Sequence, residues 1–382
     1  MTTSTALGSA ERARVAIIGA GPGGSAAAIR LAQLGVRDVV LVDLHDFPRD
    51  KTCGSGLSPR AIATLKQLRV WDRVEPLAYP IVGTRIASPG GCETWVSGGE
   101  RAAAAICLRR DFDFELYRAV LELGVRFLPH FRAKHPILRR DASGRERWAG
   151  IRAADGREIR ADFVVVANGA HSTFASVPGR KRAIHTIMGW WENVDYRPHH
   201  VEMLWVDLLR PCYGWLFPET ATRVNIGITY DDDDKSKNAR ALFERFLERH
   251  FAARLARATK IGAFKGHPIV YCYRPRKLTS PGRIAIGEAG RMTHPATGEG
   301  IYQAMHSGML AADAIAAVAA GRCSEARAFA HYERCARRRF TPSFWAGAAF
   351  RGVVRTPLFD AVVKLGSTPQ LQRATGRALA SL

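Results

Sequence analysis

Short apolar runs and glycine-rich turns alternate in the first part of the chain. Residues 15–18 and 39–42 are continuous apolar runs, which is the pattern of strands buried on both faces. Between them, the turn Gly19-Ala-Gly-Pro-Gly-Gly24 precedes an alanine-rich stretch that ends near Gly35. This order predicts a strand, a turn, a helix and a second strand, which together form the βαβ unit of a parallel α/β sheet.

The later pattern predicts further helices and a set of strands without intervening helices. Ser58 is expected to cap a helix that has Pro59 in its first position. Apolar and polar residues alternate between turns at 79–108 and 181–230, which predicts antiparallel strands in both segments. One of the strands expected in the second segment covers residues 201–208. We expect the acidic run Asp231–Asp234 to stabilise the start of the next helix through the helix dipole. Helices are also expected over 109–123, 301–320 and most of 321–382.

The glycine turn carries the first chemical signal. Gly19, Gly21 and Gly24 form a GxGxxG pattern, and Asp43 follows the last glycine by about 20 residues. In this pattern the glycines allow the backbone to approach a pyrophosphate at the positive end of a helix. The acid accepts a hydrogen bond from a ribose hydroxyl. The strand–turn–helix–strand context therefore predicts a dinucleotide site. Asn168-Gly169 and residues 287–300 form two further turns that follow short apolar runs, and we expect them to share one dinucleotide with the glycine turn.

Composition narrows the class of protein. The chain has 382 residues, a net charge of +21 and seven scattered cysteines without a CxxC pair, so we expect a reducing compartment and neither disulfides nor a metal site. The polar residues 1–12 lack the apolar core of a signal peptide, and no apolar run has the length of a membrane span. We therefore expect a cytoplasmic protein, with peripheral membrane contact as an alternative. No nucleic-acid-binding motif is present, so nucleic acid is not an expected partner.

Three distant segments complete a family pattern. They are PRDKTCGSGLSPRA (48–61), PCYGWLFPE (211–219) and GEAGRMTHPATGEGI (287–301), and Arg109 stands four residues before Asp113. Over residues 13–365 this arrangement resembles flavoproteins of the para-hydroxybenzoate hydroxylase class, and more narrowly the geranylgeranyl reductase family. The resemblance implies an α/β Rossmann-type FAD-binding domain with an inserted antiparallel substrate domain and a C-terminal helical region. The expected segments are 13–78, 100–180 and 275–320 for FAD binding, 79–99 and 181–274 for substrate, and 321–382 for the helical region.

The resemblance also implies which residues hold FAD. They belong to the glycine turn and its acid, to the two arginines expected near the cofactor, and to the 287–301 segment. The residues are Gly19, Gly21, Gly24, Asp43, Arg49, Arg109, Gly287, Glu288, Pro295, Gly298, Glu299 and Gly300. The helix after Gly300 would direct its N-terminus at the flavin ring and favour the anionic reduced form. In the family, a Gly-Asp turn at this position contacts the ribityl and pyrophosphate part of FAD. Glu288 replaces the Asp and is one methylene longer, so this contact must shift or pass through water. Asn168 replaces an Asp of the hydroxylases, which questions their way of handling NADPH but not FAD binding.

Two segments are expected to face the substrate. Cys53 follows two basic residues and is a candidate proton donor or nucleophile, with a buried structural thiol as the alternative. Tyr213, Trp215 and Phe217 alternate along one strand and predict an aromatic wall for an apolar chain, with an ordinary core strand as the alternative. The predicted catalytic residues are Cys53, Tyr213 and Trp215. Trp191, in the neighbouring Trp190-Trp191 pair, is predicted to bind substrate alongside the three aromatic residues.

The resemblance favours an FAD-dependent enzyme that reduces C=C bonds of an isoprenoid-type substrate with hydride from reduced flavin N5. NAD(P)H or another donor would supply the electrons. A monooxygenase or halogenase of the same fold is the alternative, although Lys51 alone is a poor halogenase lysine. A non-catalytic flavin carrier is the third hypothesis. The substrate, the reductant and the oligomeric state are not predicted.

The C-terminal region leaves two interpretations open. Residues 321–382 contain ten arginines and one lysine against three acids, with aromatic and aliphatic residues between them. This composition is typical of a cationic surface that contacts anionic lipid. It is equally typical of helices that cover the substrate domain and expose an arginine-rich face.

Overall fold

The computed structural model describes residues 11–97, 102–141, 144–174, 182–231 and 236–366. Its first layer is a sheet with the strand order β17-β18-β11-β1-β2-β8. The pairs from β18 to β8 are parallel, as expected for strands joined by helical crossovers. The strands are β1 (Glu11–Ile18), β2 (Val39–Val42), β8 (Arg126–Leu128), β11 (Glu158–Val166), β17 (Thr279–Ser280) and β18 (Arg283–Ala285). A hairpin of β9 (Ala133–Arg140) and β10 (Glu146–Ala153) extends this sheet from β11.

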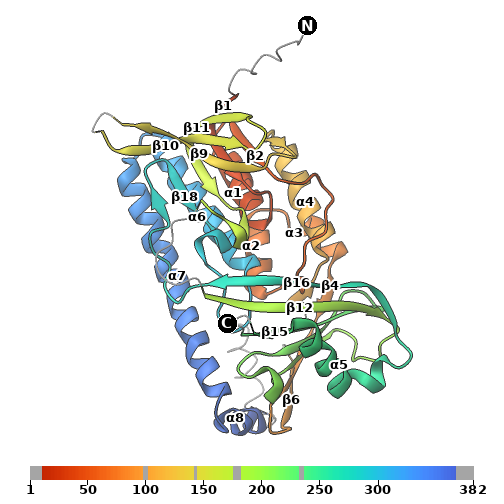
Figure 1. The fold of residues 1–382 in the computed structure, drawn as a ribbon. Helices are drawn as coiled ribbons and strands as arrows, with labels where there is room; N and C mark the ends of the chain where they lie inside the picture. Colours follow the sequence, from red (N-terminus) through yellow and green to blue (C-terminus); the bar gives the residue numbers. More distant parts are fainter. Residues whose placement is uncertain (1–10, 98–101, 142–143, 175–181, 232–235, 367–382) are drawn as a thin grey trace.

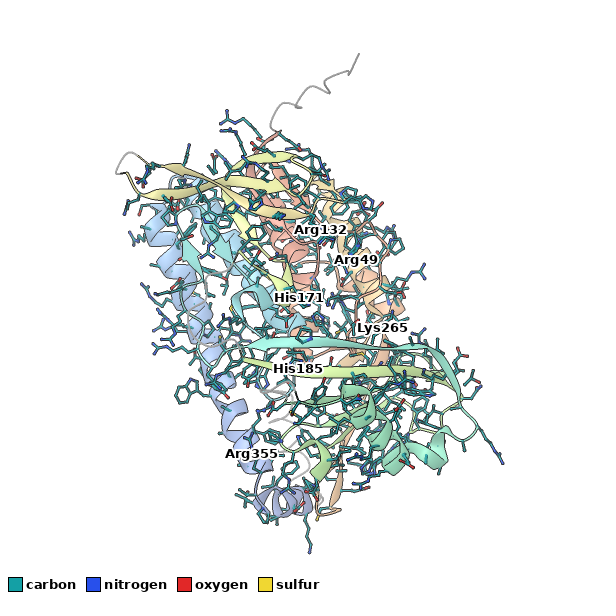
Figure 2. All side chains as sticks on the ribbon, viewed as in Figure 1. Arg49, Arg132, His171, His185, Lys265 and Arg355 are labelled. Carbon is teal, nitrogen blue, oxygen red and sulfur yellow. The ribbon has the colours of Figure 1, made fainter. Side chains whose placement is uncertain are left out.

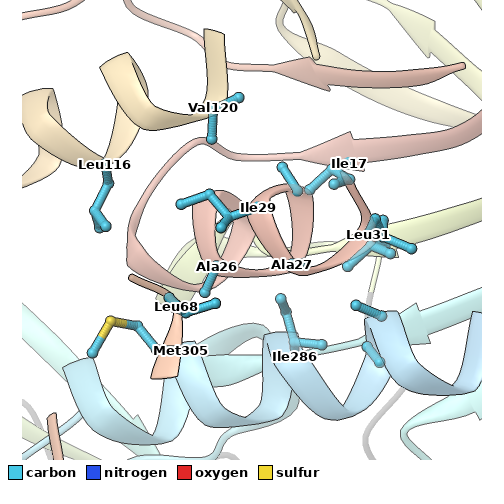
Figure 3. Close-up of a cluster of buried hydrophobic side chains, with 14 of the residues drawn as sticks. Ile17, Ala26, Ala27, Ile29, Leu31, Leu68, Leu116, Val120, Ile286 and Met305 are labelled. Atoms are coloured by element: carbon cyan, nitrogen blue, oxygen red, sulfur yellow. The ribbon is translucent and has the colours of Figure 1, made fainter. Parts of the chain in front are cut away.

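Helices cover one face of this sheet. Figure 3 shows α1 (Pro22–Gln33) between α4 (Arg109–Glu122) and α6 (Ile301–Ala319), with Ile17 of β1 next to α1. Successive residues of β1 enter different cores, because strand side chains alternate: Ile17 joins the helical side and Ile18 the hairpin side. Two shorter helices, α2 (Pro59–Gln67) and α3 (Trp71–Val74), also join the helical side.

The crossing of α1 and α6 depends on small side chains. A Cβ added at Gly308 would lie 2.4 Å from the carbonyl oxygen of Gly23, and a Cβ at Gly23 would lie 3.2 Å from that of Ala304. The two helix backbones therefore approach more closely than larger residues would allow. This close approach brings the N-terminal parts of both helices to the same region.

A second layer lies below the first in Figure 1. It is a seven-stranded sheet in the order β16-β12-β15-β14-β13-β5-β6. Its strands are β5 (Gly83–Ala87), β6 (Glu93–Ser97), β12 (Arg182–Glu192), β13 (His200–Leu204), β14 (Gly214–Pro218), β15 (Arg223–Tyr230) and β16 (Thr259–Tyr271). Helix α5 (Ala239–Leu255) packs its phenylalanines on one face. A third, small sheet has three short strands in the order β3 (Gly56–Leu57), β7 (Ala104–Ile106) and β4 (Tyr79–Ile81).

One long helix spans both layers. In Figure 1, α7 (Glu325–Val354) descends from the first sheet past the second and ends beside α8 (Leu358–Gly366). Near its start, the Tyr332 hydroxyl donates to the Ala285 carbonyl at 2.8 Å. Near its end, Val354 belongs to the same apolar cluster as Trp215 of the second sheet. Among the described residues, no helix has both the length and the apolar content that crossing a membrane requires.

The observed fold confirms the expected class, with local corrections. Ser58 caps α2 by accepting from Ala61 N at 3.2 Å, as expected. The strand expected at 201–208 ends at Leu204, where the short helix η3 (Asp207–Leu209) soon follows. The expected bounds of the FAD-binding segments, the substrate segments and the C-terminal helical region stay predictions.

The expectation for the acidic run is wrong where it can be tested. Helix α5 begins at Ala239, is capped by Asn238 and has no acid in its first turn. Asp231 instead pairs with Arg351 of α7 at 2.5 Å. The pair forms because β15 ends beside α7, so a cation distant in sequence neutralises this carboxylate. Asp232–Asp234 lie outside the described residues.

Candidate functional site

The three glycines of the GxGxxG turn, Gly19, Gly21 and Gly24, are required for different structural reasons. Gly19 has φ +99°, and its Cβ would lie 2.7 Å from the Ala167 carbonyl oxygen. A Cβ at Gly24 would lie 1.8 Å from the Gly19 carbonyl oxygen. Gly21, the N-cap of α1, has no heavy atom within 4 Å of the same position. The outer glycines therefore permit packing, while the middle one leaves open space beside the positive end of α1.

Asp43 stands at the end of β2, next to the glycine turn. Its Oδ2 accepts from Ala20 N at 2.8 Å, and its Oδ1 accepts from His45 N at 3.0 Å. These bonds fix the carboxylate, and each oxygen keeps a second acceptor position. The geometry therefore leaves Asp43 able to accept hydrogen bonds from ribose hydroxyls.

The three glycine-containing segments expected to share one cofactor do come together. Gly287 N donates to Ser307 Oγ of α6 at 2.9 Å, and a Cβ at Gly287 would lie 3.0 Å from the Ala304 Cβ. The Gly19 turn touches Ala167, the residue before the Asn168-Gly169 turn. The N-terminal ends of α1 and α6 and both turns thus surround one region.

A buried carboxylate joins the two arginines predicted to lie near the cofactor. Asp113 is fully buried and accepts from Arg109 Nε at 2.7 Å and from its Nη2 at 2.8 Å. Arg49 Nη1 lies 3.2 Å from the same carboxylate. Burial opposes the charge on Arg109, but Asp113 outweighs it and holds the Arg109 pKa above its ordinary value. Arg49 Nη2 also lies 3.8 Å from Asp43, so the two guanidinium groups face Asp113 closely and one of them faces Asp43 at longer range. Guanidinium groups held in this way present N–H donors that suit a pyrophosphate.

A second basic group lies beside this cluster, on the loop that contains Cys53. Lys51 Nζ lies 3.1 Å from His267 Nε2, and the His267 ring meets His171 edge-on at 5.5 Å. Burial, followed by the charge of Arg109, lowers the pKa of Lys51. Burial, followed by the charge of Lys51, lowers the pKa of His267 to about 3, so this imidazole is neutral near pH 7. Figure 2 shows His171 between the two layers.

The segment from Thr293 to Gly300 is held by its own side chains and by the second layer. His294 is fully buried: Nδ1 accepts from Thr297 N at 3.1 Å, and Nε2 lies 3.1 Å from the Ser343 carbonyl of α7. The Tyr213 hydroxyl donates to the Thr297 carbonyl at 2.5 Å. Arg351 reaches the Pro295 carbonyl at 3.4 Å. Helix α7 and strand β14 therefore fix the turn that begins α6.

Glu288 has another partner than the predicted one. Its Oε1 accepts from Val270 N of β16 at 2.7 Å. The extra methylene of Glu, relative to the family's Asp, gives the carboxylate the reach for this contact. The side chain thus links the Gly287 turn to the second layer, and a contact to the cofactor through it stays a prediction.

The aromatic wall forms as expected along β14. Tyr213, Trp215 and Phe217 share one face and follow one another with ring separations of 6.1 and 5.9 Å. The wall meets the cofactor segments at both ends: Tyr213 contacts Thr297, and a Cβ at Gly54 would lie 3.2 Å from the Phe217 ring. The loop containing Cys53 therefore packs directly on this strand.

Trp191 does not lie on that face. It is buried under α5, where its ring is 6.3 Å from Phe243 and 6.1 Å from Phe264. Trp190 points to the opposite side, in the cluster that contains Trp215 and Phe217. Its indole nitrogen donates to Glu219 at 3.0 Å. The substrate-binding role expected of Trp191 does not fit this position, because adjacent strand residues face opposite ways and the wall has Trp190 instead.

Unpartnered buried atoms test whether FAD fits. Five of the buried side-chain atoms without a hydrogen-bond partner come from segments around this region: Arg49 Nε, Asn168 Oδ1, Thr293 Oγ1, Glu299 Oε1 and Gln303 Oε1. Buried polar atoms are rarely left unpaired, so this concentration indicates a polar ligand. Together with the open space at Gly21 and the arginine cluster, these atoms fit the pyrophosphate, sugar chain and ring edge of FAD. Among the described residues, no group of three potential metal ligands comes together.

Several of these residues were not predicted. Thr293 and Gln303 lie within or just after a family segment, and their burial beside it is visible only in three dimensions. Asp113 was noted for its spacing from Arg109, but Arg49 is distant in sequence, so their shared carboxylate could not be inferred. His267 and Arg351 come from elements outside the family segments, and no sequence signal marks them.

Comparison with known proteins agrees with this geometry. Residues 12–341 match the FAD binding domain family. The menaquinone reductase of Mycobacterium tuberculosis is 30% identical over 328 residues, covering 79% of this chain and 76% of its own. The digeranylgeranylglycerophospholipid reductase of Thermoplasma volcanium is 28% identical over 314 residues, covering 78% and 76%.

Solved structures share the fold. A geranylgeranyl bacteriochlorophyll reductase-like protein from Thermoplasma acidophilum superposes with a TM-score of 0.80 at 22% identity, covering 93% of this chain and 90% of its own. A flavin-dependent brominase gives a TM-score of 0.80 at 21% identity, covering 97% and 93%. The fold therefore accommodates both reductases and halogenases. The sequence match over residues 12–341, with the glycine turn and the cofactor cluster, establishes that this chain belongs to the FAD binding domain family and is an FAD-dependent oxidoreductase of the geranylgeranyl and menaquinone reductase type.

Proposed function

We propose that this chain reduces C=C bonds in an isoprenoid-type chain, with bound FAD supplying the hydride. The observation that carries the proposal is the aromatic wall of Tyr213, Trp215 and Phe217. Its two ends contact the two segments that border the flavin position, the Cys53 loop and the Thr297 turn. Relatives named as reductases of menaquinone and of digeranylgeranylglycerophospholipid support the choice of substrate class.

The wall supplies an apolar surface without an unpaired donor at its centre. Trp215 is buried, and its indole nitrogen donates to Asn225 Oδ1 at 2.7 Å. Asn225 in turn donates to the Gly189 carbonyl at 3.1 Å. Since this polar atom is satisfied inside the sheet, Trp215 offers an apolar ligand ring surface and no unpaired donor. Such a surface binds a polyprenyl chain by apolar contact and excludes water from it.

Cys53 is the proposed proton donor. Its Sγ accepts from Ser55 N at 3.3 Å, and it interacts with the buried guanidinium of Arg109. The loop that contains it packs on Phe217 through Gly54, and this neighbouring contact supports a thiol position beside the wall. Cys53→Ser keeps a similar shape with a much weaker acid. Unchanged turnover and unchanged flavin reoxidation in this variant would exclude the role.

Helix α6 contributes the positive end of its dipole to the same region. Burial raises the pKa of Glu299, the residue before its N-cap. The first turn of α6 presents backbone N–H groups without helical partners to this region. These groups favour negative charge on the cofactor, and hence its reduced form. The proposed electron donor is NAD(P)H.

The reaction is tested with the FAD-loaded protein, reduced without oxygen and mixed with a geranylgeranyl lipid that lacks a quinone. Flavin reoxidation and a product heavier by one hydrogen pair for each reduced bond are expected. The same lipid with a saturated chain is the control and must give neither. Reoxidation by a menaquinone with no change in the mass of its side chain would instead indicate reduction of the quinone ring and refute the proposal.

The alternative activities give different results in the same apparatus. A monooxygenase or halogenase produces an oxygen-dependent absorbance transient after mixing with oxygen, and an oxygenated or halogenated product. Lys51 is the lysine of the loop that contains Cys53, and its ammonium group lies 3.1 Å from His267 Nε2. Because this group already has a protein partner, it adds no support for a halogenase. Any substrate-dependent reoxidation excludes a non-catalytic carrier.

A further inference from the structure

Helix α8 is apolar on two neighbouring faces, which lie about 100° apart around the helix axis. Phe359, Val363 and Gly366 are buried against the second layer. On the outer face, Leu358, Val362 and Leu365 are 58%, 46% and 58% exposed. Their spacing of four and three residues places them in one row along the helix. Packing against the second layer accounts for the inner row, whereas the side chains of the outer row are accessible to solvent.

This row holds a large share of the exposed apolar side chains. Among the described residues, ten large hydrophobic side chains are exposed, and three of them form this row. Isolated exposed leucines are common on protein surfaces, but a contiguous group indicates an interaction surface. We call Leu358, Val362 and Leu365 the outer α8 row.

The position of α8 is fixed, so the row is a permanent surface. Asp360 Oδ1 accepts from Gly90 N at 2.8 Å, and the Gly366 carbonyl accepts from Thr94 Oγ1 at 3.0 Å. These bonds tie both halves of the helix to the β5–β6 hairpin. Figure 1 shows α8 at the lower end of the molecule, away from the first layer.

The charge around the row is basic. Arg355, labelled in Figure 2 near the end of α7, has a side chain that is 55% exposed and lies 3.8 Å from Asp231, the carboxylate that Arg351 also pairs with. Lys364 lies within α8 and is exposed. The one acid of α8, Asp360, is turned to the Gly90 backbone. The whole chain carries +21, so long-range attraction also favours an anionic partner.

The inner side of α8 leads to the aromatic wall. Phe359 meets Trp205 at 5.4 Å, and Trp205 meets Tyr213 at 5.3 Å. Tyr213 contacts the Thr297 turn of the cofactor site. A continuous apolar cluster therefore connects the outer α8 row with the position where an apolar substrate is proposed to react.

We propose that the outer α8 row, with Arg355 and Lys364, docks this protein on an anionic lipid bilayer. A short helix with an apolar face and flanking cations lies in the plane of a membrane interface, where the apolar side chains insert and the cations meet lipid phosphates. The proposal concerns a surface and does not depend on the substrate. Its failure would leave the proposed reaction untouched, because the two are measured separately.

The test is flotation of the full, FAD-loaded chain with vesicles of phosphatidylcholine containing about 30% phosphatidylglycerol. The test variant is the triple Leu358→Gln, Val362→Gln and Leu365→Gln. The matched control is Leu77→Gln, Leu121→Gln and Leu123→Gln, at positions 48%, 42% and 40% exposed elsewhere on the molecule. We expect the control to bind like the wild type and the test variant to bind at least about tenfold more weakly, since three inserted side chains are lost.

Charge variants separate the electrostatic part. Arg355→Gln with Lys364→Gln should weaken binding to the anionic vesicles, and the difference should shrink at high salt. Equal FAD content and equal melting temperature show that each variant is folded.

Three results would overturn the proposal. The first is flotation of the test variant equal to that of the wild type, or a loss just as large in the control. The second is dissociation of a dimer by the test substitutions without an effect on lipid binding, which would assign the row to a second copy. The third is a lower melting temperature in the test variant alone with unchanged lipid binding, which would assign it to residues 367–382 of the same chain.

Discussion

Replacing Gly21 with alanine separates cofactor binding from folding. The residue has φ −73° and ψ −175°, an extended conformation that alanine adopts without strain, and no heavy atom lies within 4 Å of the new Cβ position. The apoprotein should therefore keep its stability to within about 1 kcal/mol. The added methyl group occupies the space in which a phosphate would approach the N-terminus of α1.

The magnitude follows from the hydrogen bonds at stake. A charge-assisted bond from a backbone N–H to a phosphate contributes about 1.5–3 kcal/mol. Displacing the pyrophosphate from one such bond, or two, weakens FAD binding by roughly tenfold to a thousandfold or more, at 1.4 kcal/mol for each factor of ten.

Two other glycines supply the comparison. Gly24→Ala puts a Cβ 1.8 Å from a carbonyl oxygen, so the backbone itself must move and the apoprotein should lose at least about 3 kcal/mol. Gly352→Ala, in the last turn of α7 with nothing within 4 Å, should leave FAD affinity unchanged and should not destabilise the protein.

The assay combines urea unfolding of the apoprotein with titration of FAD by quenching of its fluorescence. The reasoning predicts a large loss of affinity in Gly21→Ala with nearly unchanged unfolding. It would be refuted by an FAD dissociation constant within about twofold of the wild-type value. An apoprotein as unstable as the Gly24→Ala variant would refute it as well.

Further predictions concern the buried charges and rings. Asp113→Asn removes the buried carboxylate that pairs with Arg109 and Arg49 and should cost about 3–5 kcal/mol in urea unfolding. Asp111→Asn, at a half-buried position in the first turn of the same helix, should cost less than about 1 kcal/mol. Burial lowers the pKa of His294 to about 4, so unfolding takes up a proton and the contribution of His294 to stability, complete above about pH 6.5, is lost as the pH falls toward 4. His294→Gln should therefore flatten the slope of unfolding free energy against pH in this range, and an unchanged slope would contradict the assignment. Trp191→Leu should lower the melting temperature and leave the KM unchanged, whereas Trp215→Leu should raise the KM for a polyprenyl substrate; a raised KM in Trp191→Leu would restore its predicted role.

Local signals gave the most reliable part of the sequence prediction. The glycine turn, the cap at Ser58 and the helix from Arg109 all depend on residues within one or two turns of each other, and all three are found. The convergence of the Gly19, Asn168 and Gly287 turns was also predicted, because the carboxyl ends of parallel strands meet at one edge of a sheet.

The errors have a common physical origin in contacts between distant elements. The face on which Trp191 lies depends on the strand register, and β12 has an irregularity against β16 between Met188 and Trp190. The partner of Asp231 is a cation of α7 that only the folded chain brings near. Composition and spacing carry no information about such pairings.

The length and the proline of α7 have a mechanical consequence. A helix of 30 residues is about 45 Å long, and its two halves are attached to different layers. Any rotation of the second sheet against the first must therefore bend this strut. Pro342 lies inside it and removes a backbone hydrogen bond, so bending there requires the least energy. The carbonyl of the adjacent Ser343 lies 3.1 Å from His294 Nε2 in the turn before α6. Bending of α7 at Pro342 would therefore move this turn, which is part of the proposed cofactor site.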